Sequence, residues 1–547
     1  MRARRVPGAM PMAEPKPGSG WAPLRRPVFR ALWLAQTGSN LGGWMQTVAA
    51  QWFLVQSGSG SAVVAWVQAA SLLPVLLLSL IAGVLADRLD RRGLLLTMNI
   101  VSAVLAVALT VLSWTGVLSA PSLLAMTFLL GSSAALAMPA WQAIQPDLVP
   151  RDEIPAAASL GSITVNAARA VGPAIAGLLV AVSGPTLVFA LNAVSFLGVV
   201  YALLRWRRPR TGREGWREPF GDAIVAGIRY LAAGPVVRRL LLRCLLFAVP
   251  ASALWSLLPS AAEGRMGLGA AGYGLLLGML GVGSILGALL MPMVVRRVAP
   301  GWVLGASSVL FALGTAAVAW WSLPVVLPVL LVAGVAWTGT LTTLNAAMQL
   351  SAAPWVRARA IAVYLLVLMG GQGVGAFVWG AVSAAIGVAS TLAIAAGLLV
   401  LAGLSILVLP VRPDTGRLDR SIQPYCSPEP QLVFDPEPTD GPVVVTVVYR
   451  VDATNADAFL AAMALLRDSR RRTGATAWDL ERSGEHDHHY REEFRVRSWG
   501  EYRASRTERW TGNDAAVIAA VLAVAAVESE SHAFVVRVAR PHGRATR

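Results

Sequence analysis

The chain has 547 residues, of which 56% are hydrophobic and 14% are charged, with a formal net charge of +16. This charged share is well below the quarter usual for soluble domains and excludes an ordinary soluble globular protein. A nucleic-acid partner is also excluded, because the arginines are divided among many loops and a C-terminal tail instead of gathering on one face.

Long apolar segments dominate the first three quarters of the chain. A helix of about 20 apolar residues crosses a bilayer with its backbone hydrogen bonds satisfied internally. Twelve such segments are predicted: 29–56, 62–86, 94–117, 123–144, 156–182, 186–204, 240–261, 269–295, 303–321, 325–350, 360–386 and 388–409. The sequence therefore predicts a polytopic all-α membrane protein whose surroundings are the lipid bilayer.

Arginines occur almost only in alternate gaps between these segments. The gaps 87–93, 145–155, 205–239, 296–302 and 351–359 carry them, and the N-terminus carries them too. Because cytoplasmic loops are enriched in Lys and Arg, we expect both termini and the long middle loop to be cytoplasmic, in the inner membrane of a cell. The first apolar segment is already a full span, which argues against a cleaved signal peptide.

The segments form two similar sets of six. Three pairs of matching residues are each separated by 204 positions: Gly83 and Gly287, Arg92 and Arg296, and Pro150 and Pro354. Such a repeat is typical of a duplicated transporter. We expect a cytoplasmic N-terminal segment 1–28, a first half 29–204, a central loop 205–239 and a second half 240–410. In the central loop, a helix on the membrane surface is predicted from Phe220, Ile224, Ile228 and Leu231.

After Pro410 the chain becomes polar. Residues 411–441 are rich in proline and charge and are interpreted as a linker, followed by a soluble domain at 442–540 and a basic tail at 541–547. Strands are expected at 443–451, 476–482, 490–497 and 533–538, and helices at 455–472, 499–509 and 515–527. This order predicts a small α+β ferredoxin-like domain.

The loop after the second segment carries the most specific motif, Gly83-Val-Leu-Ala-Asp87-Arg88-Leu-Asp90-Arg91-Arg92. It resembles the signature of the major facilitator superfamily, although Asp90 stands where a second glycine is usual. The resemblance covers 29–410 and implies the major facilitator fold, in which this cluster holds the cytoplasmic side shut. The site residues of this gating motif are Gly83, Asp87, Arg88, Arg91 and Arg92. The alternative is a plain positive-inside anchor.

The fifth segment carries Arg169-Ala-Val-Gly172-Pro173-Ala-Ile-Ala-Gly177, which resembles the export-type motif of the superfamily. Ordinary tight helix packing is the alternative explanation. A finer resemblance is to the bacterial branch containing enterobactin exporters. It rests on 139–144, 148–153, 166–177 and 355–360, and on the tail segment 494–501, where Tyr502 replaces the usual histidine.

Polar and aromatic residues near the middle of several segments are candidates for a substrate cavity. In the first segment Trp33, Thr37, Asn40, Trp44, Thr47 and Gln51 share one helical face. The resemblance implies that segments one, four, seven and ten line the cavity. The cavity candidates are Thr37, Asn40, Trp44, Gln51, Trp255, Trp337 and Asn345, with Thr338 beside them. For any one of them, hydrogen bonding between helices is the alternative.

Arg169 and Arg243 are the notable cations within the apolar segments. Arg243 is near enough to the inner end to extend to the membrane surface. Arg169 is deeper, and we expect it to pair with Asp147 or Asp152; binding an anionic cargo is the alternative. The resemblance implies a proton as coupling ion, yet no carboxylate or histidine before Pro410 lies mid-segment. Without a Walker loop, ATP hydrolysis is not expected.

The C-terminal domain resembles dimeric ferredoxin-like proteins that include cofactor-free monooxygenases, which implies dimerisation as one possibility. Trp478 and Trp499 on an open sheet face would suit an aromatic ligand. His486, His488 and His489 are interpreted as part of a polar turn in preference to a metal site. No cofactor and no metal are expected.

The sequence therefore predicts a secondary transporter and not an enzyme. We expect it to export a small organic molecule, of the drug or siderophore type, by alternating access. The alternative is a transporter fused to an enzymatic or ligand-sensing domain.

Overall fold

The computed structural model describes residues 20–206, 234–411, 418–423, 425 and 430–535. Within helix α2 the side chains of Asp87 and Arg88 lie outside that description, and the surface helix predicted around Phe220–Leu231 falls in the undescribed stretch 207–233.

Long helices make up the membrane part. They are α1 (Pro27–Gln56), α2 (Ser61–Arg88), α3 (Arg91–Trp114), α4 (Ala120–Leu148), α5 (Ile154–Arg205), α7 (Pro235–Gly264), α8 (Ala270–Arg297), α9 (Pro300–Trp320), α10 (Leu323–Ser351), α11 (Arg357–Ile386) and α12 (Val388–Leu404). Within the described part of the chain, nine helices are long and apolar enough to cross a membrane by length and composition.

The helix α5 contains two spans. Its backbone breaks at Gly184, where φ is 74°, a value that favours glycine, and Pro185 follows directly. The spans predicted at 156–182 and 186–204 flank this break. With α5 counted as two, the fold is that of twelve helices in two halves of six, as predicted.

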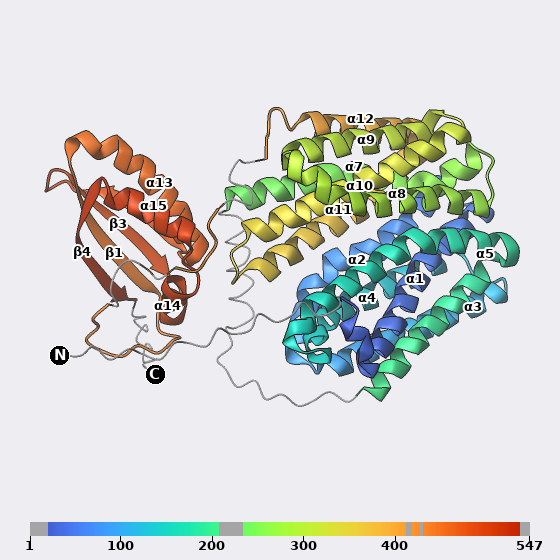
Figure 1. Cartoon of the computed structure of the whole chain (residues 1–547), viewed down its shortest axis with the longest axis horizontal. Coiled ribbons are helices and arrows are strands. Elements are labelled where there is room, and N and C mark those ends of the chain that lie inside the picture. Colours follow the sequence, from blue (N-terminus) through green and yellow to red (C-terminus); the bar gives the residue numbers. More distant parts are fainter. Residues whose placement is uncertain (1–19, 207–233, 412–417, 424, 426–429, 536–547) are drawn as a thin grey trace, which may run out of the picture.

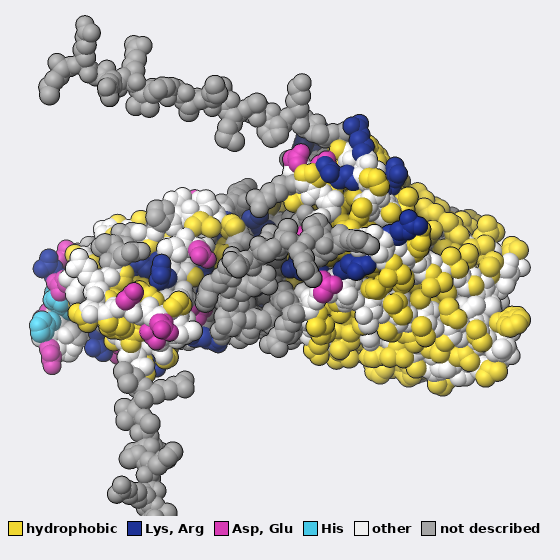
Figure 2. All heavy atoms as spheres, turned by 90° about the horizontal axis from the view of Figure 1, so that it is seen from below, with side chains coloured by type: hydrophobic (Ala, Val, Ile, Leu, Met, Phe, Trp, Pro, Cys, Tyr) yellow, Lys and Arg dark blue, Asp and Glu magenta, His cyan; other side chains and the backbone are white. Residues whose placement is uncertain are grey.

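Five helices begin or end with arginine at the same end of the bundle, which we call the basic end. Arg88, Arg91, Arg205, Arg296 and Arg357 lie within the last or first turns of their helices. Figure 2 shows Lys and Arg side chains gathered between the C-terminal domain and a broad hydrophobic surface on the membrane part. The opposite end, which we call the far end, carries Arg265 and Glu263 near its one charged turn.

The two halves contact each other toward the far end. There α2 meets α11, where the Trp66 indole donates to the Phe377 carbonyl (3.3 Å) and Ser61 lies 2.9 Å from Ser383. A second contact joins α5 and α8. Nearer the basic end both helices expose residues on more than one face, including Ile163, Val165, Asn166, Leu289, Leu290 and Met293. The halves thus diverge toward the basic end (Figure 1).

The C-terminal domain is a four-stranded antiparallel sheet with order β2-β3-β1-β4, covered on one face by helices (Figure 1). Its elements are β1 (Val443–Val451), α13 (Ala456–Thr473), β2 (Ala477–Arg482), β3 (His489–Val496), α14 (Trp499–Thr507), α15 (Gly512–Leu522) and β4 (Ala525–Phe534). This is the predicted ferredoxin-like arrangement. Alternate residues of β1, from Val443 to Val451, are buried against the helices.

Two expectations about this domain are wrong. The last strand begins at Ala525, not Ala533, because the segment predicted as helix to 527 ends early and its final residues pair with the end of β1. Trp478 and Trp499 do not line an open sheet face. Trp499 packs on Tyr502 and Phe534 and belongs to the hydrophobic core of the domain. Trp478 is partly buried against that core, and its indole donates to Glu492 (2.9 Å).

Candidate functional site: the centre of the helix bundle and the C-terminal pocket

Arg169 lies at the middle of the first span of α5, beside Trp44 of α1. Its guanidinium carbon is 5.7 Å from the centre of the Trp44 ring, a distance suited to a cation–π interaction. The expected ion pair with Asp147 or Asp152 is not formed, because among the described residues Arg169 makes no ion pair or hydrogen bond and lies over the Trp44 ring. Asp147 lies in the last turn of α4 and Asp152 just before α5, whereas Arg169 lies 15 residues after the start of α5, roughly 22 Å along the helix axis.

Trp44 is the first member of a connected aromatic group. Its ring centre lies 6.2 Å from Trp255, which lies 5.4 Å from Trp337. The ring centres of Phe247 and Phe311 each lie 5.6 Å from that of Trp337. Trp44 is partly exposed, whereas Trp255 and Trp337 are buried and their indole N–H groups bond to no described residue. Three predicted cavity residues are therefore brought together.

The export-type motif positions this group and also closes the far end. A Cβ on Gly172 would lie 2.9 Å from the Trp44 Cβ, so the missing side chain lets α5 approach α1 at Trp44. Five residues on, a Cβ on Gly177 would lie 2.6 Å from the Gly274 Cα of α8, and the Pro173 carbonyl faces Gly274. The motif is thus part of the contact between the two halves.

Gln51 lies in that closed region and not beside the aromatic group. The Tyr273 hydroxyl donates to Gln51 Oε1 at 2.6 Å, and both side chains are buried. The Tyr273 ring also stacks on Trp52, with centres 5.9 Å apart. This bond joins α1 of one half to α8 of the other. Sequence reasoning selected Gln51 as a cavity candidate and did not identify its partner Tyr273.

Some of the other cavity candidates form hydrogen bonds between helices, and others are partly exposed. Trp33 donates to the Leu160 carbonyl (3.2 Å), and the Thr37 hydroxyl lies 3.1 Å from that of Thr164, so these two join α1 to α5. Asn40 is partly exposed and accepts from Gln36 (3.3 Å). On α10, Thr338 donates to the Ser284 carbonyl (3.0 Å), and Asn345 accepts from Gln349.

Arg91 and Arg92 of the gating motif bond to helices of the first half. Asp90 caps α3 by accepting from the Gly93 amide at 2.7 Å. Arg91 donates to the Ala143 carbonyl of α4 (3.1 Å), and Arg92 donates to the Leu203 and Leu204 carbonyls (2.9 and 3.1 Å) at the end of α5. Cations at helix C-termini are favourable. In this conformation the two arginines therefore brace the first half, while Gly83 lies in the last turns of α2.

Arg243 was expected to extend to the membrane surface, but in the structure it does not. It is buried and donates to the Ala402 carbonyl (3.1 Å), the Ser405 hydroxyl (2.7 Å) and the Ser405 and Leu409 carbonyls. These groups end α12, whose last carbonyls lack partners within the helix. A cation among helix-end carbonyls is stabilised where it lies, so the side chain has no need to reach water.

His486 and His488 lie in the turn between β2 and β3, and His489 begins β3. His488 has φ of 64°, and His489 lies 3.0 Å from Glu528. Within the described part of the chain, no group of three or more His, Cys, Asp or Glu side chains is arranged to hold a metal ion.

Sequence reasoning missed a buried polar network in the C-terminal domain. Arg470 of α13 donates to Glu492 of β3 through Nε (3.0 Å), and Glu492 also accepts from the Tyr449 hydroxyl (2.9 Å). Nearby, Arg506 donates to the Tyr502 hydroxyl (2.6 Å), which lies 2.5 Å from His532 Nε2. Burial is the main cause that lowers the pKa of His532. Tyr502, noted only as a departure from the resemblance, belongs to this network.

Two halves of six helices that meet at one end, with a motif-bearing loop at the other, define a membrane transporter of the major facilitator superfamily. Residues 18–542 match the family described as transmembrane secretion effector, and the chain belongs to that family. The match includes the C-terminal domain.

Curated relatives include proteins that handle siderophores. The chain is 28% identical over 263 residues to the staphyloferrin A transporter of Staphylococcus aureus, a match covering 47% of this chain and 65% of that protein. It is 30% identical over 234 residues to the enterobactin exporter EntS of Salmonella choleraesuis, covering 42% of this chain and 55% of EntS. The matches thus span less than two thirds of these relatives.

Solved structures of low sequence identity share the fold of the membrane part. A bacterial homologue of the human lysosomal transporter Spinster, in an inward-facing and unoccupied conformation, superposes with a TM-score of 0.55 at 16% identity, covering 71% of this chain and 96% of that one. The nucleoside transporter NupG superposes with a TM-score of 0.55 at 14% identity, covering 70% of this chain and 99% of NupG.

Proposed function

We propose that the protein exports a small aromatic organic anion, of the siderophore or drug type, across the inner membrane by alternating access. The observation that carries this is Arg169 over Trp44. Arg169 is partly buried. A charge without a counter-charge is unfavourable there, and an ionisable side chain inside the membrane indicates a functional site by default. A cargo with an acidic group beside an aromatic ring would supply both the counter-charge and a surface for Trp44.

The position of the aromatic group supports a cargo site. Trp44, Trp255 and Trp337 come from α1, α7 and α10, and thus from both halves. In transporters built from repeats, cargo binds at mid-membrane between the repeats. Toward the basic end, the partly exposed Asn40 and Asn345 lie on the same helices, and Gln142 of α4 is exposed. Polar side chains inside a membrane indicate a watery path when they are not buried against protein.

Transport into inverted membrane vesicles tests the cargo class. We expect uptake of an aromatic carboxylate, such as fluorescein, and a loss of about tenfold or more in Arg169→Gln, since a charge-assisted contact contributes about 1.5–3 kcal/mol. Transport of a neutral aromatic dye should fall much less. Arg205→Gln is the matched control, because Arg205 also lies over an aromatic ring (Tyr201, 5.1 Å) but is exposed at the basic end. Equal loss for both dyes in Arg169→Gln would refute a role in anion binding.

The arginine distribution supports a cytoplasmic basic end, with both termini inside. A single cysteine at Gly484, in the turn between β2 and β3, should then resist an impermeant maleimide in intact cells, whereas one at Ser322, before α10 at the far end, should react. Native Cys244 and Cys426 are first replaced by serine. Reaction of the Gly484 cysteine in intact cells would reverse the topology.

In this proposal the conformation described is open to the cytoplasm, and the gating motif shuts that side in the alternate state. Asp87 is the residue proposed to cross between the halves there. Asp87→Asn should reduce export at matched membrane expression without preventing insertion. Unchanged export would leave the motif as a topological anchor.

A proton is the proposed coupling ion. The described carboxylates of the membrane part, such as Asp90, Glu153 and Glu263, lie at helix ends and in loops, where a proton would enter or leave but not cross. Collapse of the proton gradient by an ionophore should abolish uphill transport in vesicles. Continued uphill transport would exclude proton coupling.

A further inference from the structure

Part of the linker is docked on the C-terminal domain. Residues 419–423, which we call the strap, run beside the loop that precedes α15. The main-chain N–H of Gln423 donates to the Trp510 carbonyl (3.0 Å), and the main-chain N–H of Gly512 donates to the Ser421 carbonyl (2.9 Å). Between them, Ile422 forms an isolated β-bridge with Thr511. The strap brings Tyr425 to the domain.

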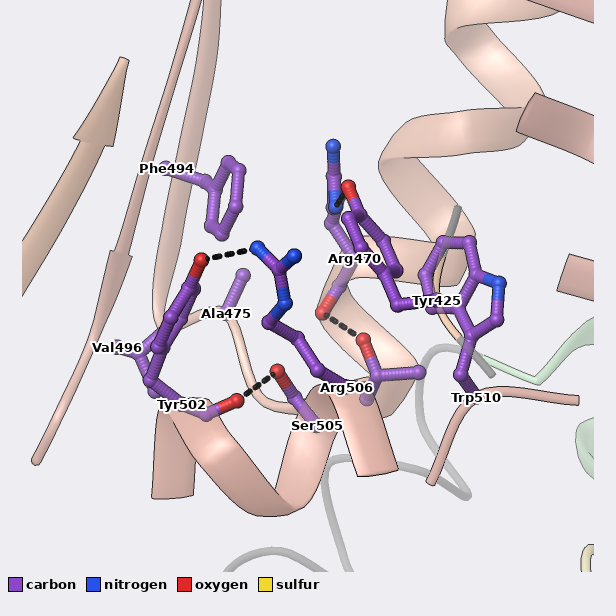
Figure 3. A pocket seen from close by; sticks show the side chains of 10 residues that line it. Tyr425, Arg470, Ala475, Phe494, Val496, Tyr502, Ser505, Arg506 and Trp510 are labelled. Atoms are coloured by element: carbon purple, nitrogen blue, oxygen red, sulfur yellow. Dashed lines mark hydrogen bonds between the residues drawn. The ribbon is translucent and has the colours of Figure 1, made fainter. Parts of the chain in front are cut away.

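The Tyr425 side chain fills a pocket between the sheet and the helices (Figure 3). Arg470 Nη1 donates to its hydroxyl at 2.7 Å, and the Arg506 guanidinium carbon is 4.3 Å from its ring centre. The Trp510 ring meets it edge-on, with centres 4.8 Å apart. The space left beside the ring is about 10 Å³, room for no more than one water molecule.

The walls of this pocket belong to the folded domain, and Tyr425 does not. Arg470 comes from α13, Phe494 from β3 and Arg506 from α14. Arg470 is fixed by Glu492, and Arg506 by Tyr502. The polar groups that hold the phenol ring are thus positioned by the domain itself. Tyr425 arrives on a short segment with a few main-chain bonds, which makes it the part that can leave.

The charges in the pocket define the kind of ring that fits. Each guanidinium has a carboxylate partner: Arg470 lies 3.0 Å from Glu492, and Arg506 lies 3.2 Å from Glu530. The two positive and two negative charges balance, so the pocket has no surplus charge for a carboxylate ligand. It offers one N–H donor to a hydroxyl oxygen, an aromatic edge and a cation above the ring face.

We propose that this pocket is a binding site for a neutral hydroxyaromatic compound, a phenol or catechol, which replaces Tyr425 and releases the strap. The site is independent of the cargo site at the centre of the bundle. The pocket is next to a contact with the membrane part. Trp510 lines the pocket, and the preceding residue, Arg509, lies over Trp355.

The first test uses the wild-type full-length protein in detergent and 4-methylphenol, which has the structure of a tyrosine side chain. Release of the strap should expose Arg420 and raise the rate of trypsin cleavage after it in a saturable manner. Toluene lacks the hydroxyl and 4-methylbenzoate carries a charge, so neither should do this. Cleavage that 4-methylphenol leaves unchanged, or that toluene raises equally, would overturn the proposal.

The second test measures affinity by calorimetry. Tyr425→Ala removes the competing ring, so 4-methylphenol should bind about tenfold or more tightly than to wild type, because the competent state is no longer a minor one. Tyr425→Phe keeps the ring and should lie between the two. Adding Arg506→Gln to Tyr425→Ala should cancel most of the gain. If that gain persists, or if toluene gains as much, the substitution has only opened an unspecific hole, and the proposal is wrong.

Discussion

The Arg509 guanidinium carbon lies 4.8 Å from the centre of the Trp355 ring, and this contact joins the C-terminal domain to the loop between α10 and α11. Arg509 is buried and also donates to Glu501 (3.1 Å) and to the Thr473 carbonyl (3.2 Å), so its position is set by the domain. Trp355 belongs to the segment by which the sequence resembles enterobactin exporters. The domain therefore contacts the membrane part at a residue close to the start of α11.

Trp355→Ala should loosen the C-terminal domain from the membrane part. A cation–π contact is worth about 0.5–2 kcal/mol, so hydrogen exchange in 505–512 should rise by a few-fold while Trp355→Phe retains most of the protection. Trp302→Ala is the matched control, because Trp302 is exposed near the basic end in α9. If exchange in 505–512 is the same in Trp355→Ala and wild type, the contact does not hold the domain.

Gly177→Ala should disfavour closure of the far end, because the added methyl group would collide with the backbone of Gly274. Overpacking of about 1–3 kcal/mol corresponds to a shift of roughly five- to 150-fold in the ratio of the two states. The shift is measured as the distance between two spin labels near the far end of the bundle, one on the first span of α5 and one on α8. Gly198→Ala, in the same helix with open space around it, should leave the distances unchanged. An unaltered distribution in Gly177→Ala would show that the helices close without this contact.

The Gln51–Tyr273 bond predicts a non-additive pair of substitutions. Tyr273→Phe leaves a buried amide oxygen without its donor and should cost roughly 1–3 kcal/mol, whereas Gln51→Leu combined with Tyr273→Phe removes both polar groups and should cost less than the sum of the single changes. Thermal unfolding in detergent measures the stability of the wild type, the two single variants and the double variant. Strict additivity would mean that the two side chains act independently.

The buried His532 predicts a loss of C-terminal domain stability in mild acid. Its pKa is lowered in the folded state, so the unfolded chain binds more protons as pH falls through the ordinary histidine range. Stability is therefore present above that range and is lost as pH falls toward the folded pKa. Hydrogen exchange of β4 at pH 7.5 and 5.5 measures the change, and His532→Gln should reduce it. The contributions of Glu530 and Arg506 to this pKa oppose each other. An equal acid response in the variant would assign the effect to another group.

The membrane fold was predictable because its signals are local. Apolar length and alternating arginines are properties of each segment, and even the break at Gly184 coincides with the predicted gap at 183–185. The motif glycines were also found, although their contacts were not. The contact of Gly177 with Gly274 depends on how the two halves pack. The spacing of residues within one segment carries no information about that packing.

The candidate site was predictable in composition but not in pairing. Trp44, Trp255 and Trp337 were selected as inward-facing and do form one group. Arg169 was expected to find a carboxylate and Arg243 to find water, because both expectations weighed only the cost of a buried charge. In the structure Arg169 lies over the Trp44 ring, and Arg243 lies among helix-end carbonyls. The pocket around Tyr425 was missed because its occupant comes from a segment whose composition indicates only a linker.

The docked strap also changes how far the C-terminal domain can travel. With residues 419–423 held on the domain, only the short stretch 405–418 separates it from the end of α12 at Leu404. A short tether confines its two ends at an effective concentration on the order of millimolar. At that concentration the weak contact of Arg509 with Trp355 forms more often than it would between separate molecules, and freeing the strap would lengthen the tether and lower that concentration.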